Sequence, residues 1–220
     1  MSNITIVTLA DVSYYKVLFS MISSVNVFCG DINIHVVLVN ADKSHEEKLK
    51  KCHDKINIEM ENVKFSTEGE KRNYCTNRRA YLFKILRDVY EGHLVWVDAD
   101  SIFRGDATDF KKHISDCEIT MRPKDLKKGT FAAGVIGIGD TPICRDFINS
   151  YYDRVESEKD WMSNQRNLNE TYRGYKGKIN FKPLDKKYCD VWLSDKGVLW
   201  AAKSKQKKDK RYLSEIAKYE

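Results

Sequence analysis

The chain has 220 residues, a formal net charge of +6 and a hydrophobic content of 42%, with 11% aromatic residues. These values fit one domain of ordinary size with a substantial core, and they exclude global disorder. The moderate basicity suits an anionic ligand such as a nucleotide but does not require nucleic acid.

The six cysteines are scattered along the chain, with no Cys-x-x-Cys pair and no zinc-type spacing. Scattered cysteines in a chain of this length are typical of reduced thiols in an intracellular protein. No signal peptide precedes the first apolar segment, and no apolar run reaches the length of a membrane span. We therefore expect a soluble, cytoplasmic protein without a transmembrane segment.

The first part of the chain alternates predicted strands and helices. Residues 4–9 and 32–39 are apolar runs typical of buried strands, and a helical apolar stripe lies between them. A capping box at 44–47 begins a short lysine-rich helix, and a third strand is weakly indicated at 56–58 or 63–65. This alternation predicts βαβ units and a parallel sheet.

A helix predicted from Thr76 to Tyr90 carries two arginines on its apolar side. Arg78 and Arg79 continue the stripe that includes Leu82. An arginine on a buried stripe needs an anionic partner, whereas a solvated first turn would need none. The two arginines are therefore candidate contacts for an anionic ligand.

The segment 93–100 is the feature around which the chain is organised, because an apolar strand runs directly into Asp98 and Asp100. Open α/β sheets bind ligands beyond the carboxyl ends of their strands. Two neighbouring carboxylates are costly to desolvate unless a positive group lies beside them. A divalent cation that also binds substrate phosphates would fill this role. The alternative is a solvated acidic turn.

The second half adds a strand at 131–139 that is rich in small residues, including Gly134. Glycine inside a strand marks either the close approach of a ligand or tight packing against another element. The remaining predicted elements are a short helix at 109–113, a strand at 118–121, a helix beginning at Thr141-Pro142, a helix opening in 160–166, short strands near 179–181 and 198–200, and a basic end at 203–211.

Taken together, these motifs resemble the nucleotide-sugar glycosyltransferases of the GT-A fold, especially small single-domain transferases of bacteria and of large DNA viruses or phages. The motifs that carry the resemblance are Thr8-Leu9-Ala10-Asp11, the arginine-bearing helix, Asp98-Ala99-Asp100, Ala133-Gly134, Trp161-Met162-Ser163-Asn164-Gln165 and Trp200-Ala201-Ala202-Lys203. The resemblance implies one α/β, Rossmann-like GT-A domain over residues 1–220. Its mostly parallel central sheet would be flanked by helices, with a small antiparallel C-terminal addition.

The resemblance also implies a division of labour along the chain. About 1–100 would bind the nucleotide, about 101–202 would form the acceptor side, and 203–220 would be a basic tail. The implied donor contacts are Thr8, Ala10 and Asp11 to the nucleoside, Arg78 or Arg79 to the diphosphate or sugar, Ala99 and Gly134 beside the donor, and Lys203 to phosphate. Asp98 and Asp100 would bind Mn²⁺ or Mg²⁺, which would offset charge on the leaving nucleotide diphosphate.

Two departures from the resembled family affect the expected chemistry. Many relatives place a histidine near the final strand as a third metal ligand, and residues 200–202 provide none. Asn164 precedes Gln165 where retaining relatives often have aspartate, and asparagine cannot act as a base or nucleophile. An inverting enzyme would use Asp160 or Glu158 as the base. A retaining enzyme would place Gln165 beneath the sugar, and the sequence favours this outcome.

The predicted function is metal-dependent transfer of a sugar, with a UDP-sugar as the first choice of donor. The acceptor would be a hydroxyl of a glycan, a lipid-linked glycan or a protein glycan. The basic run 203–211 supports an alternative acceptor, a hydroxylated base in DNA, as in phage enzymes.

Two further alternatives differ in class. A nucleotidyltransferase would need a glycine-rich loop after the first strand, which residues 10–13 do not provide. A non-catalytic binding module would show no stabilisation by Mn²⁺ in the presence of a nucleotide sugar. Trp161, Trp192 and Trp200 are candidates either for an acceptor groove or for the core.

Overall fold

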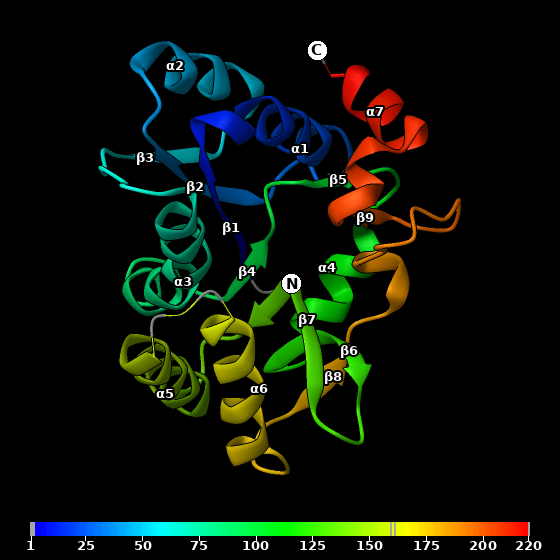
Figure 1. Cartoon of the computed structure of the whole chain (residues 1–220). Helices are drawn as coiled ribbons and strands as arrows, with labels where there is room; N and C mark the ends of the chain where they lie inside the picture. Colours follow the sequence, from blue (N-terminus) through cyan, green and yellow to red (C-terminus); the bar gives the residue numbers. More distant parts are fainter. Residues whose placement is uncertain (1–2, 159, 161, 220) are drawn as a thin grey trace. The chain divides into compact units, whose positions relative to one another are not determined.

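The computed structural model describes residues 3–158, 160 and 162–219. Seven strands form one sheet in the order β3-β2-β1-β4-β7-β6-β8, and β5 and β9 form a second sheet (Figure 1). The mostly parallel larger sheet and the small antiparallel sheet confirm the predicted α/β fold class. No helix among the described residues combines the length and apolar character that a membrane span requires.

The chain divides into two compact units, and neither is continuous in sequence. The first unit combines residues 3–5 with Lys64–Trp96 and His113–Leu184. The second unit combines Ile6–Val63 and Val97–Lys112 with the chain from Asp185 onward. The sequence therefore contributes to each unit in several separate stretches.

The first unit contains the two longest helices of the described chain. Its elements are α3 (Glu68–Leu86), β4 (His93–Val97), β6 (Ile119–Asp125), β7 (Thr130–Ile138), α5 (Pro142–Glu158), α6 (Ser163–Tyr175) and β8 (Phe181–Pro183). Helix α3 begins well before the predicted Thr76, because Thr67 caps it by accepting a hydrogen bond from the Glu70 amide at 3.1 Å. It ends at Leu86 instead of Tyr90.

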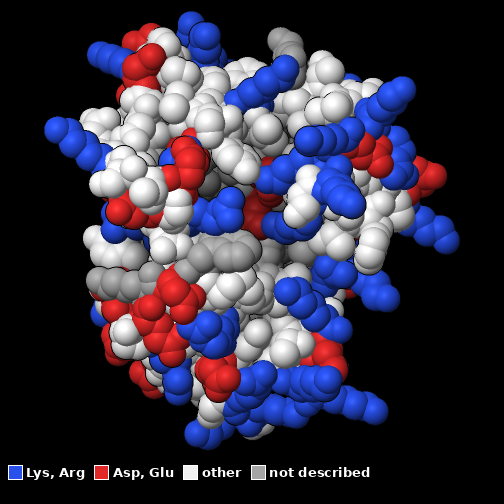
Figure 2. All heavy atoms as spheres, viewed as in Figure 1, with Lys and Arg blue, Asp and Glu red and all other residues white. Residues whose placement is uncertain are grey.

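Within the first unit, β6 and β7 form an antiparallel hairpin. Gly137 of β7 faces Thr120 and Ile114 so closely that an added Cβ would lie 2.8 Å from the Thr120 methyl group. Helix α5 begins at the predicted position, where the Cys144 amide donates to Thr141 Oγ1 at 3.4 Å. Figure 2 shows Lys and Arg side chains gathered at its lower edge, over the tip of the β6–β7 hairpin and the end of α6.

The second unit contains the N-terminal strands and the C-terminal elements. The elements that lie wholly or mostly in this unit are β1 (Ile4–Asp11), η1 (Val12–Tyr14), α1 (Tyr15–Phe28), β2 (Asn33–Val39), α2 (Lys43–Cys52), β3 (Ile56–Glu61), β5 (Ser101–Phe103), α4 (Thr108–Ser115), η2 (Lys186–Tyr188), β9 (Leu199–Ala201), η3 (Ser204–Lys208) and α7 (Lys210–Ala217). Strands β2 and β3 are parallel, with Ile34 opposite Ile56. Asp42, not Ser44, caps α2, and His45 completes its capping box.

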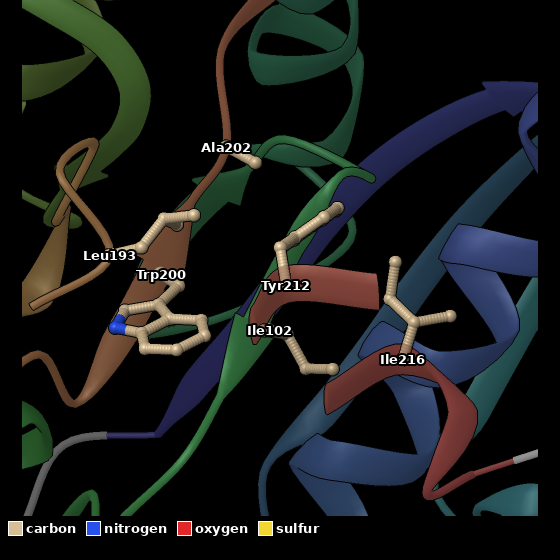
Figure 3. Packing of buried hydrophobic residues seen from close by; sticks show 6 residues of the cluster. All are labelled: Ile102, Leu193, Trp200, Ala202, Tyr212 and Ile216. Atoms are coloured by element: carbon tan, nitrogen blue, oxygen red, sulfur yellow. The ribbon is translucent and has the colours of Figure 1, made fainter. Parts of the chain in front are cut away.

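The C-terminal segment of the second unit is folded and packed. A buried cluster joins β5, β9 and α7 through Ile102, Leu193, Trp200, Ala202, Tyr212 and Ile216 (Figure 3). Strands β5 and β9 pair antiparallel, with Ser101 opposite Ala201. This pairing and the cluster connect the residues that follow β4 to the residues that follow β9.

Candidate active site

The two aspartates predicted as metal ligands lie on the turn that follows β4. The Ser101 amide donates to the carbonyl of Asp98 at 2.9 Å, which closes the turn and starts β5. Asp100 is 8% exposed, so its charge requires a nearby partner. The turn therefore presents two carboxylates in a mostly buried setting.

Two lysines of the C-terminal segment supply those partners within the second unit. Lys203 Nζ lies 2.5 Å from Asp98 Oδ2, and Lys207 Nζ lies 2.6 Å from Asp100 Oδ2. Lys207 also donates to the Tyr14 hydroxyl at 3.0 Å. The structure thus brings the predicted Asp98, Asp100 and Lys203 together and adds Lys207 and Tyr14.

The carboxylates keep both lysines charged. Burial lowers the pKa of Lys203, but Asp98 and Asp100 raise it, and the pKa ends above the ordinary value of a lysine. Burial also lowers the pKa of Lys207, while Asp100 and the Tyr14 hydroxyl raise it, again with a net increase. Two ammonium groups and two carboxylates therefore form a charge-balanced cluster.

The backbone around this cluster is held by the core beneath it. Tyr212 donates its hydroxyl to the Asp100 carbonyl at 2.7 Å, so α7 fixes the position of the turn. Burial raises the pKa of Tyr212, with a further contribution from Asp100. Ser204, between the two lysines, has φ of 45°, a conformation rare for a residue with a side chain.

The donor set fits a loosely held divalent cation. Among the described residues, Asp100 Oδ1 is a buried oxygen without a hydrogen-bond partner, and a hard cation would satisfy it. No group of three His, Cys, Asp or Glu side chains suited to a metal occurs in the described part of the chain. Asp98 and Asp100 would therefore hold Mn²⁺ or Mg²⁺ with ligand phosphates and water completing the shell.

The predicted nucleoside contacts lie at the end of β1, also in the second unit. Thr8 and Ala10 are buried in the strand. Asp11 caps η1 by accepting from the Ser13 amide at 2.8 Å and from the Ser13 hydroxyl. The Asp11 carboxylate thus has a local structural role, and a nucleoside role for these residues stays a prediction.

The predicted arginines lie in the first unit on α3. Arg79 is 6% exposed, and its guanidinium lies 4.6 Å from the centre of the Trp96 ring in β4. Arg78 is less buried and lies 3.8 Å from the centre of the Tyr81 ring. Aromatic faces therefore orient both guanidinium groups.

The remaining predicted residues of the first unit lie on β7 and near the start of α6. Gly134 is buried within β7. Asn164 donates to the Thr76 carbonyl, and Gln165 donates to the Phe131 carbonyl. These amides attach the start of α6 to α3 and β7.

Asp160 is a weak candidate for a general base. Its Oδ2 lies 2.6 Å from the Arg166 guanidinium, and hydrogen bonding to Arg166 lowers the pKa of Asp160. Glu158 pairs with the same guanidinium at 2.6 Å, and its pKa is lowered for the same reason. Both candidates for an inverting mechanism are therefore held as ion-paired carboxylates.

The tryptophans predicted to lie in an acceptor groove or in the core differ in solvent exposure. Trp200 is a core residue, 2% exposed, whereas Trp192 is 72% exposed. Trp161 lies outside the described residues.

The sequence does not indicate the role of Lys207, because this residue lies in a basic run that resembles a solvated surface segment.

Comparison with solved structures defines the class of fold. The glycosyltransferase GlyE of Streptococcus pneumoniae aligns with a TM-score of 0.69 and 14% identity over 100% of this chain and 60% of GlyE. The bifunctional glycosyltransferase WbbM aligns at 0.67 and 12% identity, over 98% of this chain and 50% of WbbM. The chain thus spans 60% of the length of GlyE and 50% of the length of WbbM.

A third neighbour is similar in length to this chain. The galactosyltransferase LgtC, solved with donor and acceptor sugar analogues, aligns at 0.63 and 12% identity over 97% of this chain and 95% of LgtC. An active-site mutant of LgtC with glutamate in place of glutamine aligns at 0.65 and 16% identity, over the same shares of both chains. No model of a known protein family matches the sequence, and a search of curated proteins finds no match. The fold is that of the GT-A glycosyltransferases, as the sequence motifs predicted.

Proposed function

We propose that this protein is a glycosyltransferase that moves a sugar from a nucleotide diphosphate, in the first place UDP, to a hydroxyl acceptor. The observation that carries the proposal is the cluster of Asp98, Asp100, Lys203 and Lys207 at the end of β4. A cation on the carboxylates and two adjacent ammonium groups match the charge of a diphosphate. The chain also shares its fold with the structurally similar glycosyltransferases GlyE and LgtC.

The lysines have a direct role in this proposal. When a diphosphate enters, Lys203 and Lys207 exchange a carboxylate partner for a phosphate oxygen and remain charged. They would then stabilise the negative charge that develops on the diphosphate as the bond to the sugar breaks. A bound Mn²⁺ or Mg²⁺ would supply Lewis-acid stabilisation of the same charge.

We infer a retaining outcome. Asp160 and Glu158 are ion-paired with Arg166, which lowers their strength as bases for an incoming hydroxyl. Gln165, near the start of α6, would contact the donor sugar, and the leaving diphosphate would accept the acceptor proton. The neighbour LgtC also has a glutamine in its active site, which is replaced by glutamate in the solved mutant.

The acceptor we favour is a saccharide, either free, lipid-linked or on a protein. The alternative of a DNA acceptor depends on the basic run 203–211, and three of the cations in this run form ion pairs with carboxylates. Lys203 and Lys207 pair with the aspartate turn, and Arg211 pairs with Asp209 at 2.8 Å. Less of that charge is therefore available to a phosphate backbone.

We also propose a reducing compartment such as the cytoplasm, because all six cysteines are free thiols.

Thermal unfolding with a panel of nucleotide sugars, with and without Mn²⁺, tests the proposal. A donor at one hundred times its dissociation constant adds about 2.7 kcal/mol, which raises the unfolding temperature by about 5–10 °C. Asp100→Asn should abolish the Mn²⁺-dependent part, whereas Asp109→Asn, on the exposed start of α4, should retain it. Lack of response to every donor would favour a non-catalytic binding module.

A further inference from the structure

A concentrated positive surface lies in the first unit and contains none of the residues assigned above. We call it the lysine face. It consists of exposed side chains at the hairpin tip and at the end of α6: Lys124, Lys127, Lys128, Arg173, Lys176 and Lys178. Figure 2 shows Lys and Arg side chains gathered at its lower edge, where Figure 1 places the hairpin tip and the end of α6.

The two segments of the lysine face are connected. Arg173 Nε donates to the Lys128 carbonyl at 3.1 Å, which joins the end of α6 to the hairpin turn. The turn is closed by a hydrogen bond from Gly129 N to the Leu126 carbonyl at 3.2 Å. Gly129 has φ of 59°, and an added Cβ would lie 3.3 Å from Arg173 Cγ. The charges are therefore presented by ordered backbone, not by a solvated tail.

The charge of this face is only partly balanced. Glu170 pairs with Arg173 at 2.5 Å, and Asp125 lies 3.8 Å from Lys128. Among the described residues, Lys124, Lys127 and Lys176 have no ion-pair partner. Like charges held at this density repel one another, so the surface favours an extended anionic partner.

An apolar side chain lies within the charged surface. Leu126 is 45% exposed at the tip of the hairpin, directly before Lys127 and Lys128. A lipid headgroup region accepts both features, because an apolar side chain enters the acyl boundary while lysines bind phosphate. A nucleic acid would bind the lysines but would leave Leu126 in water.

We propose that the lysine face binds the surface of a membrane that contains anionic lipids. This inference does not depend on the proposed transferase activity. If both hold, the acceptor would be presented at a bilayer, which favours a lipid-linked saccharide over a free one.

Sedimentation with vesicles of phosphatidylcholine containing about 30% phosphatidylglycerol tests the proposal. Each basic residue near an anionic surface contributes about five-fold in affinity, so replacing three weakens binding about 100-fold. The test variant is Lys124→Gln, Lys127→Gln, Lys128→Gln. The matched control is Lys205→Gln, Lys208→Gln, Lys210→Gln, which removes the same charge from exposed positions of the second unit.

We expect the test variant to lose binding to the anionic vesicles and the control to bind them as the wild type does. None of the three proteins should bind vesicles of pure phosphatidylcholine. Leu126→Ser should weaken binding without changing its dependence on salt. The donor-induced thermal shift should be the same in all of these variants, which separates this surface from the proposed activity. Failure of the wild type to bind the anionic vesicles would overturn the proposal. So would a test variant that loses affinity for duplex DNA while vesicle binding is unchanged, since the face would then bind nucleic acid.

Discussion

Lys207 holds Asp100 through a 2.6 Å contact between Nζ and Oδ2. A lysine of η3 thereby occupies one oxygen of a carboxylate that a divalent cation would also use. The other oxygen, Oδ1, is buried and has no hydrogen-bond partner among the described residues. In the proposed function, the ammonium and a bound cation would therefore compete for the charge of one aspartate, and they would cooperate only when a diphosphate accepts the lysine.

Lys207→Met should separate these two effects. In the protein without nucleotide, we expect tighter Mn²⁺ binding, because a competing positive charge has been removed. Affinity for UDP should fall, by about 10-fold, because a charge-assisted contact to phosphate is lost. Titration calorimetry of Mn²⁺ and of UDP measures both, with Lys208→Met as a control at an exposed position of the same helical turn. Unchanged affinities for both ligands would exclude Lys207 from the site.

Gln165 and Asn169 provide a matched pair on α6. Both amides contact Phe131 of β7: Gln165 donates to its carbonyl, and Asn169 Oδ1 accepts from its amide at 3.1 Å. Each alanine substitution should cost about 1 kcal/mol of unfolding free energy for the lost hydrogen bond. Only Gln165→Ala should lower kcat, by at least about 10-fold, because only Gln165 is proposed to meet the sugar. Equal kcat values in the two variants would assign Gln165 a purely structural role.

Arg79 should contribute more to stability than Arg78. The Arg79 guanidinium is buried on the Trp96 ring, whereas Arg78 lies on Tyr81 at a partly exposed position. Replacing Arg79 with Met should lower the unfolding free energy by about 1–2 kcal/mol, and replacing Arg78 by about 0.5–1 kcal/mol. Urea denaturation measures both, and the reverse order would contradict the assigned geometry.

Gly137→Ala should destabilise the first unit. The added Cβ would lie 2.8 Å from Thr120 Cγ2 and 3.0 Å from Ile114 Cδ1, so packed side chains must move. Overpacking of this kind costs about 1–3 kcal/mol. Gly105→Ala is the control, because an added Cβ there meets nothing within 4 Å. Comparable unfolding temperatures for the two variants would show that the sheet adapts without cost.

His35 should make the protein less stable in mild acid. Burial lowers the pKa of His35 below its ordinary 6.5, although Glu59 opposes the shift. As the pH falls below 6.5, the unfolded chain takes up a proton before the folded protein does, so the unfolding free energy decreases. His35→Gln should therefore lose less stability than the wild type between about pH 7 and pH 5. Urea unfolding at several pH values tests this, and parallel curves would refute it.

Much of the fold follows from local sequence. The apolar run at 93–97 predicts β4, and Thr141-Pro142 predicts the start of α5, because each signal acts within a few residues. The first turns of α3 were missed because Thr67 and Glu70 begin a polar stretch without a clear apolar stripe. Capping by Thr67 stabilises the start of that stretch, and α3 as a whole packs against α5 and α6.

The candidate site was only partly predictable for a different reason. Asp98 and Asp100 carry a local signal, since a buried strand runs directly into them. Lys207 carries none, because its role depends on the pairing of β5 with β9, which joins segments far apart in the sequence. A run of lysines looks the same in a sequence whether it is solvated or bound to carboxylates.

The discontinuous second unit has a consequence for how the protein is made. Its aspartate turn is synthesised long before the strand and lysines that complete it, which begin at Leu199. During translation, Asp98 and Asp100 therefore lack their lysine partners, and β5 lacks its partner strand, until residues 199–207 have been synthesised. Assembly of this unit therefore requires the closure of a long loop between β5 and β9, and such closure slows folding. A chain truncated before Lys203 would therefore keep both aspartates but lack both lysines of the cluster.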